Sequence, residues 1–176
     1  MREFLAQIDT AMPQRTYDFV QVDVFTRTPL AGNPLAIFPD ARGLNDAEMQ
    51  ALAREMNLSE TTFIFLRDAA TEAREGKKVR IFTVETELPF AGHPTLGTAL
   101  YLYASESTKP AEISLDLKAG KIPVRFTANS ENAGCDRVDG QVFGEMRQCD
   151  PEFGTPLSRD DVARVLGIAV DEIPSE

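Results

Sequence analysis

Residues 96–104 are the segment that most constrains what this chain can fold into. They read Leu-Gly-Thr-Ala-Leu-Tyr-Leu-Tyr-Ala, with apolar or small side chains throughout and no charge before Glu106. Pro94 suits a first helical turn, where its missing N–H costs nothing, and the pattern predicts a helix over residues 95–104. A helix that is apolar on every face requires burial on every face. We therefore expect other elements to surround it.

Most of the remaining chain predicts short strands. Alternating polarity and runs of β-branched or aromatic residues indicate strands at 17–25, 35–38, 59–66, 79–84, 111–117, 121–126 and 141–148. A turn rich in glycine and proline joins the first two strands, and Gly120 lies between the fifth and the sixth, so both pairs are expected to be hairpins. These segments predict many short strands around one buried helix.

Two further helices and one loop are expected. Asn45 is a predicted N-cap because Glu48, three residues later, has the capping-box spacing and apolar residues then recur at helical intervals. Ser158 is expected to cap a short helix over residues 159–166. Residues 67–78 are charged and rich in alanine, and they are predicted to form a solvated loop.

Composition excludes some kinds of partner. The chain has 18 basic and 28 acidic residues, a net charge of −10, which repels a polyphosphate backbone, so no nucleic-acid partner is expected. It has no uncharged apolar run long enough to cross a bilayer, so no membrane partner is expected. The first residues do not have the pattern of a secretory signal, which leaves the cytoplasm as the expected compartment.

Neither cysteine predicts metal or disulfide chemistry. Cys135 and Cys149 form no CxxC pair and no dense disulfide framework. The sequence has a single histidine, and no cluster of histidine and cysteine has the spacing of metal ligands. No metal site is expected.

The single histidine, His93, lies where the apolar helix should begin. Backbone N–H groups are free at a helix start, and we expect them to gather beside His93, Thr95 and Leu96, where they favour an anion such as the carboxylate of a small acid. The alternative is that the histidine only completes a tight turn between a strand and a helix. The local sequence supports both interpretations about equally.

Several motifs occur in a specific order along the chain. They are Asp-Val-Phe at 23–25, Gly-Asn-Pro-Leu-Ala at 32–36, Asn-Leu-Ser-Glu-Thr-Thr-Phe at 57–63, Arg-Ile-Phe-Thr at 80–83, the stretch 87–97, Gly-Lys-Ile-Pro-Val at 120–124 and Met-Arg-Gln at 146–148. Each motif is weak alone. The ordered set resembles the phenazine-biosynthesis PhzF-like isomerase family, relatives of diaminopimelate epimerase, over residues 17–176.

The resemblance implies an α+β fold of two similar lobes, each a rolled, mostly antiparallel sheet around a central helix, with the active site in the cleft between them. On this pattern residues 1–16 are an N-terminal extension, residues 17–148 the first lobe and residues 149–176 the start of a truncated second lobe. In two-lobed relatives the last strand returns to complete the first lobe. We therefore expect an open sheet edge here, which a homodimer or a strand exchange would cover.

The resemblance also implies site residues and chemistry. Family members look like cofactor-independent acid/base isomerases, in which the glutamate of a Ser-Glu-Thr motif moves a proton between carbons of a small carboxylic acid. Glu60 matches this glutamate, Gly92 and His93 match positions at the substrate, and Asn33 matches a residue that positions it. Without the resemblance, Glu60 is predicted to face solvent at a strand start, and Asn33 to hold its own turn. His93 is expected either to donate a hydrogen bond to the substrate or only to orient it.

Three functions follow from these expectations. The first is a PhzF-like isomerase that is weak or inactive as a 176-residue chain, because catalysis in a cleft requires groups on both sides of the substrate. The second is a non-catalytic binding or interaction module derived from one lobe. The third is a thiol-dependent racemase, which the sequence disfavours because related enzymes carry a cysteine where this chain has Ala91, and Cys135 and Cys149 lie elsewhere.

Overall fold

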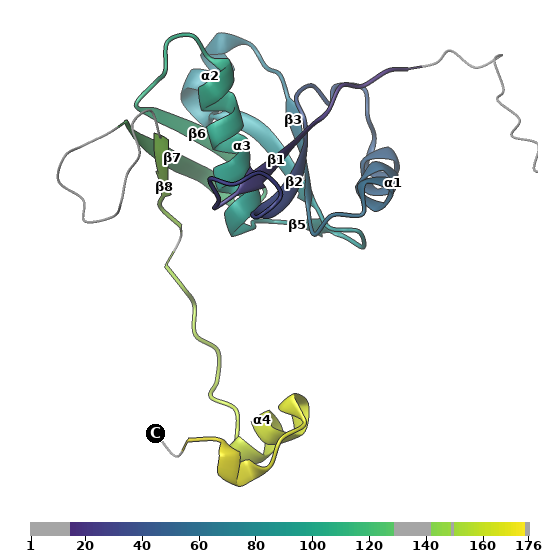
Figure 1. The fold of residues 1–176 in the computed structure, drawn as a ribbon, viewed down its shortest axis with the longest axis vertical. Helices are drawn as coiled ribbons and strands as arrows, with labels where there is room; N and C mark the ends of the chain where they lie inside the picture. The colour runs from purple at the N-terminus through teal and green to yellow at the C-terminus, as the bar shows by residue number, and fades with distance from the viewer. Residues whose placement is uncertain (1–14, 129–141, 149, 175–176) are drawn as a thin grey trace, which may run out of the picture.

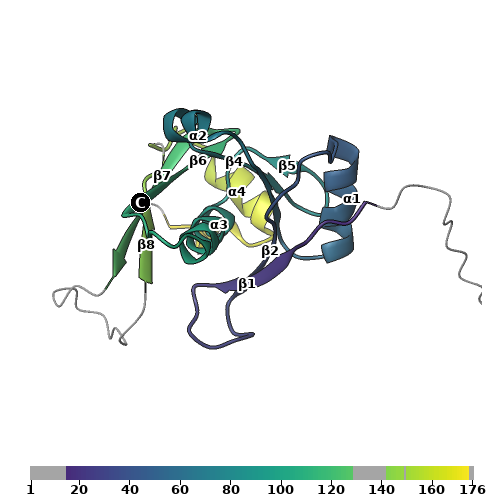
Figure 2. The ribbon, with the colours of Figure 1, turned by 90° about the horizontal axis from the view of Figure 1, so that it is seen from above.

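The computed structural model describes residues 15–128, 142–148 and 150–174, and within them one sheet of eight strands curves around a helix (Figures 1 and 2). The strands are β1 (Val20–Val24), β2 (Asn33–Phe38), β3 (Thr61–Phe65), β4 (Lys77–Phe82), β5 (Glu87–Leu88), β6 (Glu112–Leu117), β7 (Gly120–Ala128) and β8 (Val142–Met146). The helices are α1 (Asp46–Met56), α2 (Ala69–Glu75), α3 (Gly92–Ser105) and α4 (Arg159–Leu166), followed by a 3₁₀ turn, η1 (Val170–Glu172).

The sheet is mostly antiparallel, as expected. Its strand order is β1-β2-β3-β4-β6-β7-β8, with the short β5 paired to β4. The pairs β2–β3 and β4–β6 are parallel, and the remaining pairs are antiparallel, including the two predicted hairpins β1–β2 and β6–β7. The seven predicted strands correspond to all of these except β5, which the sequence did not predict. The α+β fold with a rolled sheet around one helix is confirmed.

The central helix is α3, and it begins three residues before the predicted start. The face of α3 toward the sheet is buried, with Thr98, Ala99 and Leu102 packed among the aliphatic side chains of the strands. Gly97 makes this close packing possible, since a Cβ at this position would lie 2.7 Å from Val24 Cγ2 and 2.8 Å from Leu35 Cδ2. The sheet therefore approaches the helix more closely than any larger residue would permit.

The prediction that α3 is buried on every face is wrong in part. The strands β1 and β8 form the two edges of the sheet, and they do not close over the helix (Figure 2). A groove of about 740 Å³ lies there, and Leu96, Leu100 and Tyr101 of α3 line it together with residues of β1 and β8. The prediction of an open sheet edge agrees with this groove. The helix is thus covered by strands except along the groove.

The outer face of the sheet carries α1 (Figure 2). The predicted capping box is present, because the Asn45 side chain accepts from Glu48 N and the Glu48 side chain accepts from Asn45 N. Met49 and Ala53 of α1 are buried in a cluster that includes Phe63 of β3. Side chains alternate between the two faces of a strand, so Thr61 and Phe63 point toward α1 whereas Glu60, Thr62 and Ile64 point toward α3.

The loop predicted over residues 67–78 is wrong, because its middle is the helix α2. The Asp68 side chain caps this helix by accepting from Thr71 N at 3.0 Å, and alanines favour its turns. None of the residues of α2 is buried. Ion pairs tie it to the sheet, including that of Glu72 Oε2 with Lys77 Nζ of β4 at 2.9 Å. Capping and charge pairs, rather than an apolar face, therefore stabilise α2.

The C-terminal helix α4 lies apart from the sheet (Figure 1). Ser158 caps it as predicted, its side chain accepting from Asp161 N, and Gly167 ends it with φ +69°. Val165 and Leu166 of this helix are exposed. No helix within the described ranges is both long and apolar enough to cross a membrane.

Candidate active site

Glu60 lies at the start of β3, directly after the turn that follows α1. Asn57 ends α1 in the left-handed conformation, with φ +52°, and its N–H donates to Ala53 O. Asparagine tolerates this conformation better than most residues, so the chain can turn sharply and enter β3 within a few residues. The pleat of the strand then directs the Glu60 side chain toward α3 rather than toward solvent.

His93 comes from the first turn of α3 and meets Glu60. His93 Nε2 lies 3.4 Å from Glu60 Oε2, and the two side chains are only 10% and 17% exposed. The two atoms are within ion-pair distance, but they lack the alignment of a hydrogen bond, and neither has a hydrogen-bond partner among the described residues. The solvent-facing glutamate predicted from local sequence is therefore wrong.

Buried polar atoms without partners are uncommon because they lose their hydrogen bonds to water. Here Glu60 Oε2 and His93 Nε2 lie side by side in that condition. A bound polar molecule that reaches both atoms would restore those hydrogen bonds. This arrangement is typical of a ligand site rather than of a structural ion pair, which would have closer and better aligned contacts.

The start of α3 corrects the predicted set of free N–H groups. Thr95 N donates to Ala91 O at 3.3 Å, and Thr95 Oγ1 donates to the same oxygen at 2.6 Å, so the Thr95 N–H is already used. Because the helix begins at Gly92, its first N–H groups belong to Gly92 and His93, and Leu96 lies beyond the first turn. No side chain caps this end of the helix. The expected anion site therefore keeps His93, loses Thr95 and Leu96, and gains Gly92.

Gly92 does not fill a tight space. A Cβ built on it would lie 3.6 Å from Met146 Cε, an ordinary van der Waals contact. Packing within the described residues therefore does not require glycine at this position. This separates Gly92 from Gly97, five residues further along the same helix, where a Cβ would lie within 3 Å of the side chains of Val24 and Leu35.

Asn33 is exposed at the first position of β2, and its role stays a prediction. The strands β2 and β3 are parallel, with Ala36 opposite Thr61, so Asn33 lies at the end of the sheet where Glu60 enters. The turn before Asn33 is held by Asp23, whose Oδ2 accepts from Leu30 N at 2.6 Å. The turn-holding role predicted as the alternative for Asn33 thus belongs at least in part to Asp23.

An ion-pair network supports the segment that leads into α3. Arg80 of β4 donates to both carboxylate oxygens of Glu87, at 2.8 Å each, and its third nitrogen lies 2.7 Å from Asp46 Oδ1 at the start of α1. The hydrogen bonds from Arg80 hold the pKa of Glu87 below its usual range, although partial burial opposes this, and the same partner raises the pKa of Arg80. The network joins β4, β5 and α1 shortly before His93.

Sequence reasoning missed two threonines next to the pair. Thr62 Oγ1 and Thr98 Oγ1 lie 2.9 Å apart, and both side chains are fully buried between β3 and α3. A usable signal was present, since Thr98 is a hydroxyl residue in an otherwise apolar helix that was expected to be buried. A buried hydroxyl needs a partner, and Thr62 is the residue that provides one.

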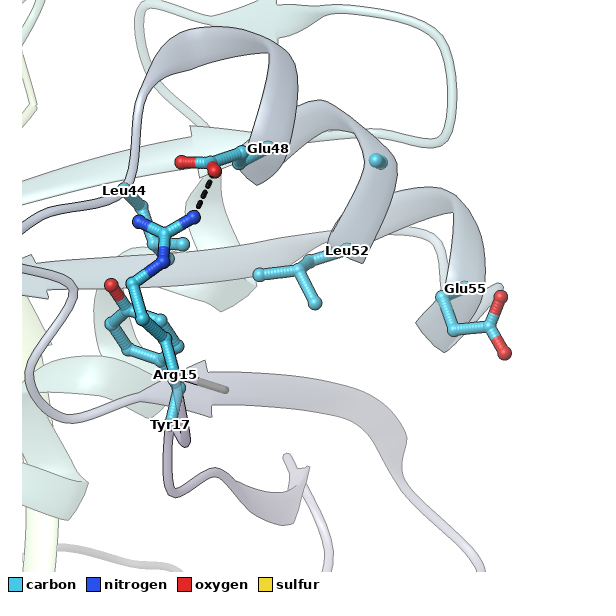
Figure 3. Close-up of a pocket in the computed structure, with 7 residues that line it drawn as sticks. Arg15, Tyr17, Leu44, Glu48, Leu52 and Glu55 are labelled. Atoms are coloured by element: carbon cyan, nitrogen blue, oxygen red, sulfur yellow. Dashed lines mark hydrogen bonds and ion pairs between the residues drawn. The ribbon is translucent and has the colours of Figure 1, made fainter. Parts of the chain in front are cut away.

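Two hollows of the surface lie away from this pair. One is the groove beside α3 described above. The other, of about 530 Å³, lies on the outer face of α1, where Arg15 forms an ion pair with Glu48 above Tyr17, with Leu44 and Leu52 as the apolar floor (Figure 3). Neither hollow is lined by Glu60 or His93. No group of three or more histidine, cysteine, aspartate or glutamate residues in the described segments is placed to hold a metal ion.

A curled, mostly antiparallel sheet around a central helix, with a carboxylate and an imidazole meeting at the helix start, defines an epimerase-like α+β fold. Residues 22–152 match the family model described as phenazine biosynthesis-like protein. The chain therefore belongs to the PhzC-PhzF family, and the resemblance inferred from the ordered motifs is confirmed.

Individual relatives agree with this assignment. The chain is 39% identical over 154 residues to an uncharacterized isomerase of Pasteurella multocida, covering 86% of this chain and 51% of the relative. It is 40% identical over 162 residues to trans-2,3-dihydro-3-hydroxyanthranilate isomerase of Pseudomonas fluorescens, covering 91% and 52%. The structure of a predicted epimerase from Pseudomonas aeruginosa superposes with a TM-score of 0.73 at 31% identity, covering 91% of this chain and 54% of that one. The chain thus spans about half the length of the curated relatives it matches.

Proposed function

We propose that this chain provides one wall of a cofactor-independent, PhzF-like isomerase site, in which Glu60 transfers a proton between two carbons of a small carboxylic acid. The observation that carries the proposal is the buried pair of Glu60 Oε2 and His93 Nε2, which lie 3.4 Å apart and have no hydrogen-bond partner in the described segments. Similarity to isomerases of the same family supports the reaction class.

In the proposed reaction, the Glu60 carboxylate takes a proton from one carbon of the acid. The electron pair of the broken C–H bond moves into the substrate and forms an enolate-like anion. The protonated Glu60 then returns the proton to a second carbon, so the product is an isomer and no electrons leave the site. The Glu60 side chain is only 17% exposed, so a substrate that meets it is also shielded from water.

The start of α3 would bind the negative charge of the acid. His93 Nε2 has no hydrogen-bond partner within the described ranges and can donate to a substrate carboxylate or to the developing enolate when it carries the proton. The N–H groups of Gly92 and His93 add donors at the positive end of the helix dipole. Asn33, at the same end of the sheet, would position the substrate from β2.

A second wall is part of the proposal. Groups on both sides of a substrate are needed to orient it and to exclude water, and the Glu60–His93 pair lies outside both hollows described above. We therefore expect weak turnover for the 176-residue chain alone. A homodimer that places a second copy opposite the pair would raise the activity, and activity should then increase with protein concentration.

A binding module without catalysis is the second candidate. The same unpaired atoms that suit proton transfer would also bind a small carboxylate without turnover. The thiol-dependent racemase is less well supported, because the start of α3 reads Ala91, Gly92 and His93 and carries no thiol. Cys135 and Cys149 lie outside the described residues.

The test is isomerisation of trans-2,3-dihydro-3-hydroxyanthranilic acid, the substrate named for the Pseudomonas fluorescens relative. The reaction is followed by NMR in D₂O, so that exchange at carbon is seen even if turnover is slow. With the wild type we expect the proton signals of the reacting carbons to disappear as deuterium replaces the protons. With Glu60→Gln these signals should remain. Glu55→Gln, which changes an exposed glutamate of α1, should behave as the wild type. Equal exchange with Glu60→Gln would exclude Glu60 as the acid/base group, and binding without any exchange would favour the binding module.

A further inference from the structure

The hydroxyl pair Thr62–Thr98 connects the two elements that carry the proposed catalytic pair. Thr62 is on β3, two residues after Glu60, and Thr98 is on α3, five residues after His93. Their Oγ1 atoms lie 2.9 Å apart, and both side chains are fully buried. A side-chain hydrogen bond thus joins β3 to α3 close to the Glu60–His93 pair.

The spacing of the two pairs matches along both elements. Two residues of strand advance by about 6.6 Å and five residues of helix by about 7.5 Å. The strand β3 and the helix α3 therefore run in the same direction with similar rises between the two contacts. A displacement of α3 along β3 that changed one contact would change the other by nearly the same amount.

The remaining contacts between β3 and α3 do not fix this displacement as narrowly. Ile64 and Ala99 belong to the aliphatic core around the helix. Apolar contacts are non-directional, so they tolerate small sliding movements that keep the same area buried. A hydrogen bond between two buried hydroxyls tolerates only a few tenths of an ångström, and neither hydroxyl can turn to water instead.

We propose that the Thr62–Thr98 hydrogen bond is a positioning contact that sets the distance between Glu60 and His93. This inference rests on the proposed function for its consequence in catalysis, although the distance itself is a property of the folded chain. Thr62 and Thr98 act through their neighbours and do not touch the substrate. Loss of the bond lets α3 move relative to β3, and proton transfer then starts from a less favourable geometry.

Thr61 offers a matched control within the same strand. It is next to Thr62 and is equally buried, but its Oγ1 has no hydrogen-bond partner and its side chain points toward α1. Valine has the shape of threonine without the hydroxyl. Thr61→Val therefore removes a buried hydroxyl from β3 without breaking a link to α3, whereas Thr62→Val breaks that link.

The experiment combines five variants with two readouts. The variants are Thr61→Val, Thr62→Val, Thr98→Val, Thr98→Ser and the double variant Thr62→Val with Thr98→Val. One readout is kcat and KM for the isomerisation above. The other is the NMR spectrum of the His93 imidazole, which needs no substrate and gives a single set of signals because the chain has one histidine.

We expect Thr62→Val and Thr98→Val to lower kcat by roughly tenfold with a smaller change in KM, and to shift the His93 signals and their pH titration. Thr61→Val should match the wild type in both readouts, and Thr98→Ser, which keeps the hydroxyl, should recover most of the kcat. Each single valine variant leaves one buried hydroxyl without its partner, whereas the double variant leaves none. The double variant should therefore have the thermal stability of the wild type, but its kcat and its His93 signals should stay as in the single variants.

Two results would overturn the inference. One is a double variant that regains stability, kcat and the His93 signals together, which would assign the hydroxyl pair a purely structural role. The other is a Thr62→Val spectrum for His93 that is the same as that of Thr61→Val. If the wild type shows no isomerisation, the proposed function fails, while the His93 spectra still decide whether the hydroxyl pair positions the site.

Discussion

Glu60 and His93 face each other across 3.4 Å at the point where β3 and α3 begin, and the part of the chain that the structure describes offers the facing oxygen and nitrogen no other partner. The contact joins β3, which begins after the sharp turn at Asn57, to α3, which begins without a side-chain cap. Both residues are therefore placed by the ends of rigid elements, which is how precise sites are commonly built.

Replacement of His93 should weaken the binding of a small carboxylate more than it changes the stability of the fold. We expect His93→Ala to weaken the binding of a small carboxylate by about tenfold, because one charge-assisted hydrogen bond is lost. Isothermal titration calorimetry with benzoate or anthranilate measures this change. Loss of the Nε2 hydrogen-bonding group should change the free energy of unfolding little, since no described residue is a hydrogen-bond partner of Nε2 in the ligand-free chain. Unchanged affinity in this variant would remove His93 from the binding site.

The sequence predicted the elements of this lobe better than it predicted their ends. The capping box at Asn45, the uncharged helix and the strand patterns are local signals, and each corresponds to an element of the fold. None of the residues of helix α2 is buried, and the helix has no apolar stripe. Apolar periodicity therefore gives no helix signal there and predicts a loop. The start of α3 was placed late because Gly92 and His93 are weak helix formers.

Only the ordered family motifs predicted the residues of the candidate site. Local sequence predicted an exposed Glu60, since nothing in residues 57–63 reveals that α3 packs against the start of β3. The Thr62–Thr98 contact is likewise a tertiary feature, although a lone hydroxyl in an apolar helix pointed to it. The division into an extension and two lobes stays a prediction.

Helix α2 should depend strongly on its cap. We expect Asp68→Ala to destabilise it by about 1 kcal/mol, because the Asp68 carboxylate is the partner of Thr71 N and Thr71 Oγ1. Hydrogen exchange of the α2 amides should accelerate while that of the β3 amides stays close to the wild type, because α2 buries no residue of its own. Thr71→Ser is the matched control, since it keeps both the N–H and a hydroxyl donor. Equal acceleration in α2 and β3 would contradict the independence of α2.

The Arg80–Glu87 pair should make stability depend on acid pH. The pKa of Glu87 is lower in the folded chain than its ordinary value of about 4.3, because Arg80 donates to both carboxylate oxygens. The pair therefore contributes stability above that ordinary value, and the contribution is lost as the pH falls through the lower folded pKa. Urea unfolding of Glu87→Gln between pH 7 and pH 3 should show a weaker pH dependence than that of the wild type.

Asp40→Asn provides the comparison for this measurement. The Asp40–Arg42 pair is more exposed, and water screens it, so its removal should alter the acid dependence less although the pKa of Asp40 is also lowered by Arg42. A larger effect at Asp40 than at Glu87 would contradict the assignment of the acid sensitivity to the pair that supports the approach to α3.

Two glycines of α3 should respond in opposite ways to alanine. In Gly97→Ala the new Cβ would lie 2.7 Å from Val24 Cγ2 and 2.8 Å from Leu35 Cδ2, so we expect a loss of about 1–3 kcal/mol in the free energy of unfolding, although alanine favours helices. In Gly92→Ala the nearest atom is Met146 Cε at 3.6 Å, so stability should be unchanged or slightly higher. Chemical denaturation measures both.

Gly92 then serves as a probe of the ligand. Its open side faces no tight packing within the described residues, so any cost of a methyl group there must come from a molecule that approaches the helix start. We expect Gly92→Ala to weaken the binding of a small carboxylate by about tenfold while the chain stays fully folded. Gly144→Ala is the control, because its Cβ would also meet its neighbours at 3.6 Å but on Leu96 and Leu100 beside the groove. Equal carboxylate affinity in both variants would place the ligand away from the start of α3.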